Sequence, residues 1–197
     1  MRFCSSAALA LPLIALAACN QKAETAPPTT EVAQNNAGVT DSLDGAAPAM
    51  ARAALSMADG KSVGDATATE TPDGLLIAVN GIALPAGTHG IHIHMTGKCE
   101  GPKFESAGAH WNPAGRKHGS ESPDGQHAGD LPNLVVAANG AGTLTFTIPN
   151  AALSGGAEAL LDGDGAAMVI HDKPDDLKTD PTGASGDRIA CGVFSAA

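Results

Sequence analysis

The amino-acid sequence predicts an all-β domain, a sandwich or barrel that carries two long loops. Turn-forming residues are abundant, with 24 Gly and 13 Pro among 197 residues, which favours many short strands over long helices. Short apolar runs recur between turn signals such as Asp59-Gly60 and Asn139-Gly140. Two stretches, 98–130 and 172–188, show no strand pattern, and loops of that length in a compact domain are usually functional.

An export signal is expected at the start of the sequence. Its first 20 residues carry one early cation and then an apolar run too short to span a bilayer. The tetrapeptide LAAC, which ends at Cys19, resembles the lipobox of bacterial lipoproteins, so we expect a signal peptide at 1–18 and lipid on Cys19. Ordinary cleavage after Ala18 is the alternative. Either route predicts a periplasmic protein, and Asn20 in place of an aspartate favours the outer membrane as the site of a lipid anchor.

A disordered tether is expected to follow the lipidated cysteine, over residues 19–49. The segment is rich in Ala, Thr, Pro, Gln and Asn and shows no apolar periodicity. Such a composition cannot bury enough surface to offset its own ordering entropy. The folded domain is therefore predicted to span 50–197.

The expected strands follow one another in short runs with a period of two. They cover residues 51–57, 66–70, 75–80, 134–138, 143–148 and 167–171. The first three read as a meander, because Asp59-Gly60 and Pro72-Asp73-Gly74 supply tight turns between them.

Charge and cysteine usage exclude some partners and indicate one covalent link. The formal net charge of −10 argues against nucleic acid and against an anionic membrane surface, so membrane contact is expected only through the lipid anchor. Cys4 would be lost with the signal peptide, and Cys19 would carry the lipid. Cys99 and Cys191 remain, and in an oxidising compartment two thiols indicate one disulfide; two separate buried thiols are the alternative.

Histidines gather in the segment GTHGIHIH, which holds three of the seven in the chain. In a strand, His92 and His94 share one face while Ile91 and Ile93 point into the core. The same alternation in AMVIH puts His171 opposite Ile170. A lone strand histidine is usually a solvated surface residue, but a pair at i and i+2 favours a metal site.

The first long loop supplies a second set of metal-ligand residues. It contains His110, His118, His127 and Asp130, and three imidazoles with one carboxylate form a closed tetrahedral set suited to zinc. A zinc ion would also hold a loop that has little core of its own. The alternative is four polar loop residues that share no ligand.

Six segments then carry a resemblance that spans the chain from about Arg52 to the C-terminus. They are GTHGIHIH, AGAHWNP, RKHG, QHAGDLPN, VIHDKPDD and GDRIACGV, in that order. In these segments the sequence resembles the copper–zinc superoxide dismutases of the bacterial, exported branch. The resemblance implies a Greek-key β-sandwich or flattened barrel, whose two long loops carry the metal site and whose fold includes one disulfide.

The resemblance also implies a role for each site residue. It assigns copper to His92, His94, His110 and His171, and zinc to His110, His118, His127 and Asp130, with His110 bridging the two ions. Asp175 would orient one ligand of each metal, the alternative being a solvated loop charge, and His89 matches a position that is not a ligand. Arg188 would stand beside the copper and bind the anionic substrate.

The implied activity is the dismutation of superoxide to dioxygen and hydrogen peroxide, with one copper and one zinc per subunit. Because a protein of charge −10 repels an anion, attraction must be local, and lysines in the two loops could assist Arg188. These are Lys98, Lys103, Lys173 and Lys178, each of which also reads as a solvated surface residue. Monomer and homodimer stay open. The alternatives are a copper-binding or storage lipoprotein without turnover and a purely structural sandwich.

Overall fold

The computed structural model describes residues 49–156 and 158–197. The expected signal peptide, the lipidated Cys19 and all but the last residue of the tether therefore lie outside the described residues. The elements are β1 (Met50–Met57), β2 (Ser62–Thr71), β3 (Gly74–Gly81), β4 (Gly87–His89), β5 (Ile91–His94), the 3-10 helix η1 (Glu105–Ala107), β6 (Leu134–Val136), β7 (Gly142–Pro149), β8 (Ala167–His171), β9 (Arg188–Val193) and β10 (Ser195–Ala196). In this described part, no helix is long and apolar enough to cross a membrane.

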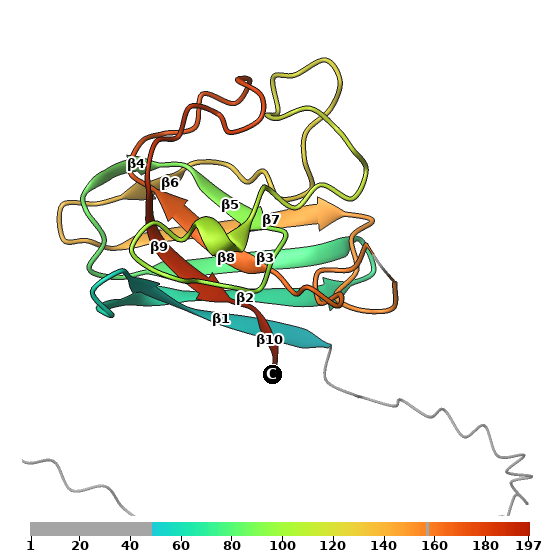
Figure 1. Cartoon of the computed structure of the whole chain (residues 1–197), viewed down its shortest axis with the longest axis horizontal. Coiled ribbons are helices and arrows are strands. Elements are labelled where there is room, and N and C mark those ends of the chain that lie inside the picture. The colour runs from blue at the N-terminus through green and yellow to red at the C-terminus, as the bar shows by residue number, and fades with distance from the viewer. Residues whose placement is uncertain (1–48, 157) are drawn as a thin grey trace, which may run out of the picture. The chain divides into compact units, whose positions relative to one another are not determined.

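The strands form a curled antiparallel sheet (Figure 1). Seven strands lie in the order β5-β8-β9-β1-β2-β3-β7, with β10 added to β1, and β4 pairs with β6. Only Gly90 separates β4 from β5, and β6 contacts β7. The curled sheet therefore approaches closure as a flattened barrel, and the non-adjacent position of β3 and β4 gives the crossing connection of a Greek key.

Alternation along the strands builds a core of small and branched side chains. In β1, Ala51, Ala53 and Leu55 are buried while their neighbours face outward. Ile77 of β3 joins the same apolar cluster, together with Ile93 of β5. This pattern is the period of two expected of strands with one face on the core, so the all-β prediction is confirmed.

The predicted strands are observed with shifted ends, and three further strands appear. β4 and β9 were not expected, because GTH has no apolar alternation and RIACGV is interrupted by Cys and Gly. β10 was not expected either, and it has only two residues. β9 pairs with both β8 and β1. The disulfide between Cys99 and Cys191 is confirmed, with the two Cα atoms 5.7 Å apart, and it ties the loop after β5 to β9.

Two loops, formed by residues 111–133 and 172–187, lie side by side above the sheet (Figure 1). The Glu121 N–H donates to the Leu177 carbonyl at 2.9 Å. At Gly119, φ is +90° and a Cβ would overlap that same carbonyl, so only glycine allows the close approach. The loops thus cover the ends of β5 and β8, where the histidines lie.

Candidate metal centre

Two neighbouring strands position the first histidine group, which we call the copper group: His92, His94, His110 and His171. In the β5–β8 ladder, His92 stands opposite Val169 and His94 opposite Ala167. His171 ends β8 at a β-bulge, and His110 joins β5 through an isolated bridge to His94. One ring nitrogen of each residue lies within 4.8 Å of the others.

Each ring of the copper group is buried, and one nitrogen of each has no hydrogen-bond partner among residues 49–156 and 158–197. The exposed fractions are 0% for His92, 1% for His94, 5% for His110 and 4% for His171. The unpartnered atoms are His92 Nδ1, His94 Nε2, His110 Nε2 and His171 Nε2. The other ring nitrogen of each histidine has a partner. Those of His92 and His110 lie 2.5 Å from Asp175 Oδ2 and 2.8 Å from Asp130 Oδ1. Those of His94 and His171 lie 2.9 Å from the Gly108 carbonyl and 3.3 Å from the Gly186 carbonyl.

These contacts decide which nitrogen carries the proton. A carbonyl or carboxylate accepts, so in a neutral ring the bonded nitrogen holds the N–H and the other presents a lone pair. Four buried lone pairs that face one another without donors are costly to leave unpaired. A bound cation satisfies all four, and imidazole nitrogens suit Cu(II).

Burial keeps the rings of the copper group neutral at physiological pH. It lowers the pKa of His92 to about 3, even though the hydrogen bond to Asp175 opposes the shift. Burial likewise lowers the pKa of His171 to about 4 and places that of His94 well below its usual value. Neutral rings are the form that binds a metal ion.

The second group, which we call the zinc group, is His110, His118, His127 and Asp130. The Nδ1 atoms of its three histidines surround Asp130 Oδ1 at 2.8, 3.1 and 3.2 Å. Nδ1 of His118 lies off the direction of a hydrogen bond and has no partner. The other oxygen, Oδ2, accepts backbone N–H groups from Gly119 at 2.9 Å and His127 at 3.0 Å.

The zinc group has the donor set of a closed tetrahedral site. Three nitrogens and one carboxylate oxygen lie within 4.8 Å of one another, and all four residues are buried. Burial alone would lower the pKa of His118. The carboxylates of Asp130 and Asp175 outweigh this effect and raise the pKa of His118 to about 9. A zinc ion would take the place of that proton, which is the usual exchange at such sites.

Asp175 links the two groups. It is 5% exposed, and its Oδ2 lies 2.5 Å from His92 Nε2 and 2.9 Å from His118 Nε2. The Leu177 N–H donates to its Oδ1 at 2.5 Å. Burial would raise the pKa of Asp175, but the hydrogen bonds from His118 and His92 hold it below its usual range. A carboxylate held this way can orient one residue of each group.

Asn133 also fixes Asp175, and the sequence analysis did not identify it. Its side-chain amide donates to the Asp175 carbonyl at 2.9 Å, and its Oδ1 accepts the Asp175 N–H at 2.8 Å. The two residues are 42 positions apart. Only the motif QHAGDLPN, whose last residue is Asn133, could have drawn attention to it.

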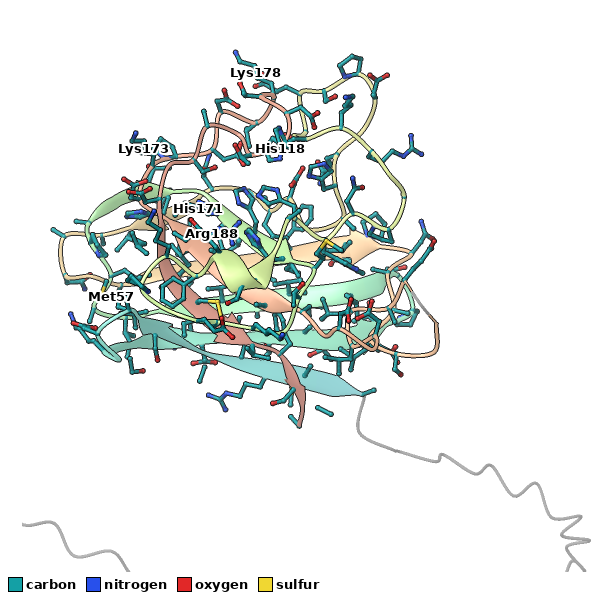
Figure 2. All side chains as sticks on the ribbon, in the orientation of Figure 1. Met57, His118, His171, Lys173, Lys178 and Arg188 are labelled. Carbon is teal, nitrogen blue, oxygen red and sulfur yellow. A yellow bond between two sulfur atoms is a disulfide. The ribbon has the colours of Figure 1, made fainter. Side chains whose placement is uncertain are left out.

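Arg188 lies beside the copper group (Figure 2). Its Nη2 donates to the Gly108 carbonyl at 2.7 Å, and the same oxygen accepts from His94 Nδ1. Its Nη1 donates to the Phe104 carbonyl at 2.7 Å. Two bonds leave three of the five guanidinium N–H groups for other partners. The half-buried side chain lines a surface cleft of about 790 Å³, so an anion from solvent can reach it.

The remaining predicted residues differ in their surroundings. His89 is buried, with its ring nitrogens 2.7 Å from the His171 carbonyl and 2.9 Å from the Pro85 carbonyl, and it belongs to neither group. Lys103 lies in the Arg188 cleft, 3.9 Å from Glu105. Lys178 lies toward the tip of the 172–187 loop (Figure 2).

Comparison with known proteins agrees with this geometry. The family described as copper/zinc superoxide dismutase (SODC) matches residues 62–194. A protein of Caulobacter vibrioides named superoxide dismutase (Cu-Zn) is 45% identical over 147 residues, 73% of this chain and 84% of that protein. A superoxide dismutase (Cu-Zn) of Aquifex aeolicus is 43% identical, over 73% of this chain and 85% of that protein.

Solved structures of superoxide dismutase-like proteins resemble this chain as well. The crystal structure of a superoxide dismutase-like protein from Bacillus subtilis superimposes with a TM-score of 0.68 at 41% identity. The match covers 72% of this chain and 96% of that one.

Proposed function

This chain belongs to the copper/zinc superoxide dismutase family, and we propose that it dismutates superoxide at the copper group. The overall reaction takes two superoxide ions and two protons to one dioxygen and one hydrogen peroxide. The observation that carries the proposal is the convergence of four buried, unpartnered imidazole nitrogens beside a fixed guanidinium. When bound, copper supplies the alternating one-electron acceptor and donor that the two half-reactions need.

Arg188 binds and orients the substrate. Its guanidinium stays charged and is held by the Phe104 and Gly108 carbonyls, so its free donors meet an anion without reorganising. The cleft is also lined by Asp59, Glu105 and Asp187, so the attraction that offsets the net charge of −10 acts only close to the Arg188 guanidinium. Lys103 stands in the same cleft and can assist the approach.

His110 is the residue that can carry a proton to the reduced substrate. Its ring belongs to both groups, with Nδ1 facing Asp130 and Nε2 facing the copper group. While Nδ1 is engaged on the zinc side, Nε2 is the atom that can take up a proton and release it. The burial of His110, at 5% exposed, limits the water around that atom.

The assignment of zinc rests on Asp130 and the two loop histidines. Because zinc does not change its redox state, its role would be to hold His110 in orientation and to order the 111–133 loop. The hydrogen bonds of Asp175 to His92 and His118 join the two groups into one unit, which supports a common role.

The N-terminal signals extend the proposal to the location of the enzyme. We propose that the protein is exported to the periplasm and anchored through lipid on Cys19, with the following segment acting as a tether. Mass spectrometry of the mature protein checks this directly. A diacyl or triacyl adduct on Cys19 supports the anchor, whereas an unmodified N-terminus after Ala18 contradicts it.

Direct observation of superoxide decay tests the activity. The protein loaded with copper and zinc should accelerate the decay, the zinc-only protein should not, and the rate should fall as ionic strength rises if local charge attracts the anion. Absence of catalysis with both metals bound would contradict the proposal and favour a copper-binding protein without turnover.

A further inference from the structure

The 111–133 loop is attached to the 172–187 loop at several points, and His118 is held there through both its ring and its backbone. Its ring Nε2 lies 2.9 Å from the Asp175 carboxylate. Its backbone N–H donates to Asp180 Oδ1 at 2.9 Å. Both attachments come from the same neighbouring loop, so the ring and the backbone of His118 are fixed together.

All polar contacts of the Asp180 carboxylate reach across to the other loop. Besides His118, they involve Lys117 Nζ at 3.2 Å and His127 Nε2 at 3.9 Å. Within the described residues, this carboxylate makes no hydrogen bond to its own loop. It therefore acts on residues 117–127 rather than shaping the segment that carries it.

Asp176 shows the opposite arrangement in the same loop. Its carboxylate accepts from the backbone of Lys178 and from both the backbone and the hydroxyl of Thr179. Those partners lie two and three residues away, which is an ordinary local turn. The contrast shows that the cross-loop contacts of Asp180 are not a general property of the acidic residues there.

The contact with His118 is the strongest of the Asp180 interactions. A backbone N–H bonded to a carboxylate is a charge-assisted hydrogen bond, about twice as strong as a neutral one. The Lys117 pair is 59% and 38% exposed, and such pairs contribute little. At 3.9 Å, His127 is beyond hydrogen-bond distance and is only attracted electrostatically.

From these contacts we propose that Asp180 is a positioning residue for the zinc group, which holds the backbone of His118 so that Nδ1 faces Asp130. The inference rests on the proposed zinc site. Asp175 orients the His118 ring from its Nε2 side, and Asp180 sets the position of the chain that carries the ring. Neither contact involves the metal itself. Among the described residues, Asp180 contacts none that belongs only to the copper group, so its loss should affect the retention of zinc and not the retention of copper.

The rate of zinc release to a chelating dye tests the proposal on the full chain loaded with copper and zinc. D180A should release zinc about 10-fold faster than the unchanged protein, in the range found when a partner of a metal ligand is lost, and should retain copper equally well. D180N keeps an oxygen acceptor for the His118 N–H and should release zinc at an intermediate rate. It also provides a test if D180A does not fold.

Asp124 offers the matched control. It is exposed in the same loop as His118, and within the described part of the chain its carboxylate has no hydrogen bond or ion pair, so D124A and D124N change the charge equally without cutting a cross-loop contact. Zinc release from the Asp180 variants at the rate of the Asp124 variants would overturn the proposal. Superoxide decay measured on the unchanged protein decides the dismutase function separately, since it does not depend on Asp180.

Discussion

The two metal groups are built from different kinds of structure. Three members of the copper group stand on or at the end of paired strands β5 and β8. In the zinc group, His118 and His127 lie in irregular loop, and Asp130 is joined to β5 only by an isolated bridge to His92. The copper group is therefore positioned mainly by the sheet, whereas the zinc group depends on contacts between loops.

This difference predicts which site forms first. A strand ladder fixes the relative positions of His92, His94 and His171 through backbone hydrogen bonds and a packed core. The 111–133 loop instead relies on polar contacts around Asp130, Asp175 and Asp180. An ion bound there adds its binding free energy to the ordering of the loop. We therefore expect the copper group to be preformed and the zinc group to be completed by its ion.

The largest effect should come from removing one ligand on each side. H92A should abolish dismutation, because the copper ion that exchanges electrons is lost. H118A should lose zinc but retain copper, and activity should fall by about 10- to 100-fold as His110 loses its orientation. Metal analysis and superoxide decay measured together check both. Equal loss of both metals in H118A would contradict the distinction between the two groups.

Loss of the disulfide is the next largest effect and should act on stability. Cys99 and Cys191 are separated by 92 positions, and closing a loop of that size contributes about 4–5 kcal/mol in the chain-entropy model. C99S/C191S should therefore unfold at a clearly lower denaturant concentration. If the midpoint of unfolding is unchanged, the covalent tie between the loop and β9 does not stabilise the folded protein.

Acid and base should affect the two groups of the metal-free protein in opposite ways. The pKa values of His92 and His171 are lowered in the folded protein, to about 3 and about 4. Their contribution to folding stability is therefore full above the pKa of about 6.5 that histidine has in the unfolded chain. It is lost as the pH falls from about 6.5 through the folded pKa values. The pKa of His118 is raised to about 9, so its contribution is full below about 6.5 and is lost as the pH rises through 9.

Ring titrations by NMR in the presence of a chelator check these directions. His92 and His171 should remain neutral well below pH 6, and His118 should remain protonated above pH 7. A single common titration near pH 6.5 for all three rings would contradict the account of burial and of the two carboxylates.

Arg188 should separate substrate binding from metal binding. R188A should slow superoxide decay by about 10-fold, the lower end of electrostatic steering effects, while both metals stay bound. R188K should recover part of the rate, since it keeps the charge but loses the paired donors. Loss of copper in R188A would instead show that Arg188 supports the fold of the site.

The smallest effects are expected at the exposed lysines. Lys103, 79% exposed in its side chain and paired with Glu105 at 3.9 Å, should change the rate by no more than about twofold when replaced by Ala. Lys178, toward the loop tip away from Arg188 (Figure 2), should change it less. Rates measured at low and high salt distinguish steering from other effects.

Much of the fold could be predicted because local signals agree with it. Turns at Asp59-Gly60 and Asn139-Gly140 and the alternation in β1 and β3 follow from backbone preference and a single buried face. β9 could not be predicted in this way. Its pairing with β8 and β1 is decided by distant segments, which no local pattern records.

The candidate site was predictable where residue type carries the chemistry. Imidazoles two apart in a strand and a His-rich loop with an aspartate point to metal from the sequence alone. Asn133 and Asp180 are ordinary polar residues in the sequence. Their importance comes from hydrogen bonds to partners 42 and 62 positions away, and only the folded chain brings these together.

We expect copper to occupy the group carried by the strands and zinc the group carried by the loops, with His110 between them. Anomalous diffraction from crystals of the loaded protein, recorded at the copper and zinc absorption edges, tests it most directly. A copper peak is expected among the unpartnered nitrogens of His92, His94 and His171, and a zinc peak beside Asp130 Oδ1. Exchanged or mixed peaks, or a single ion between the groups, would contradict it.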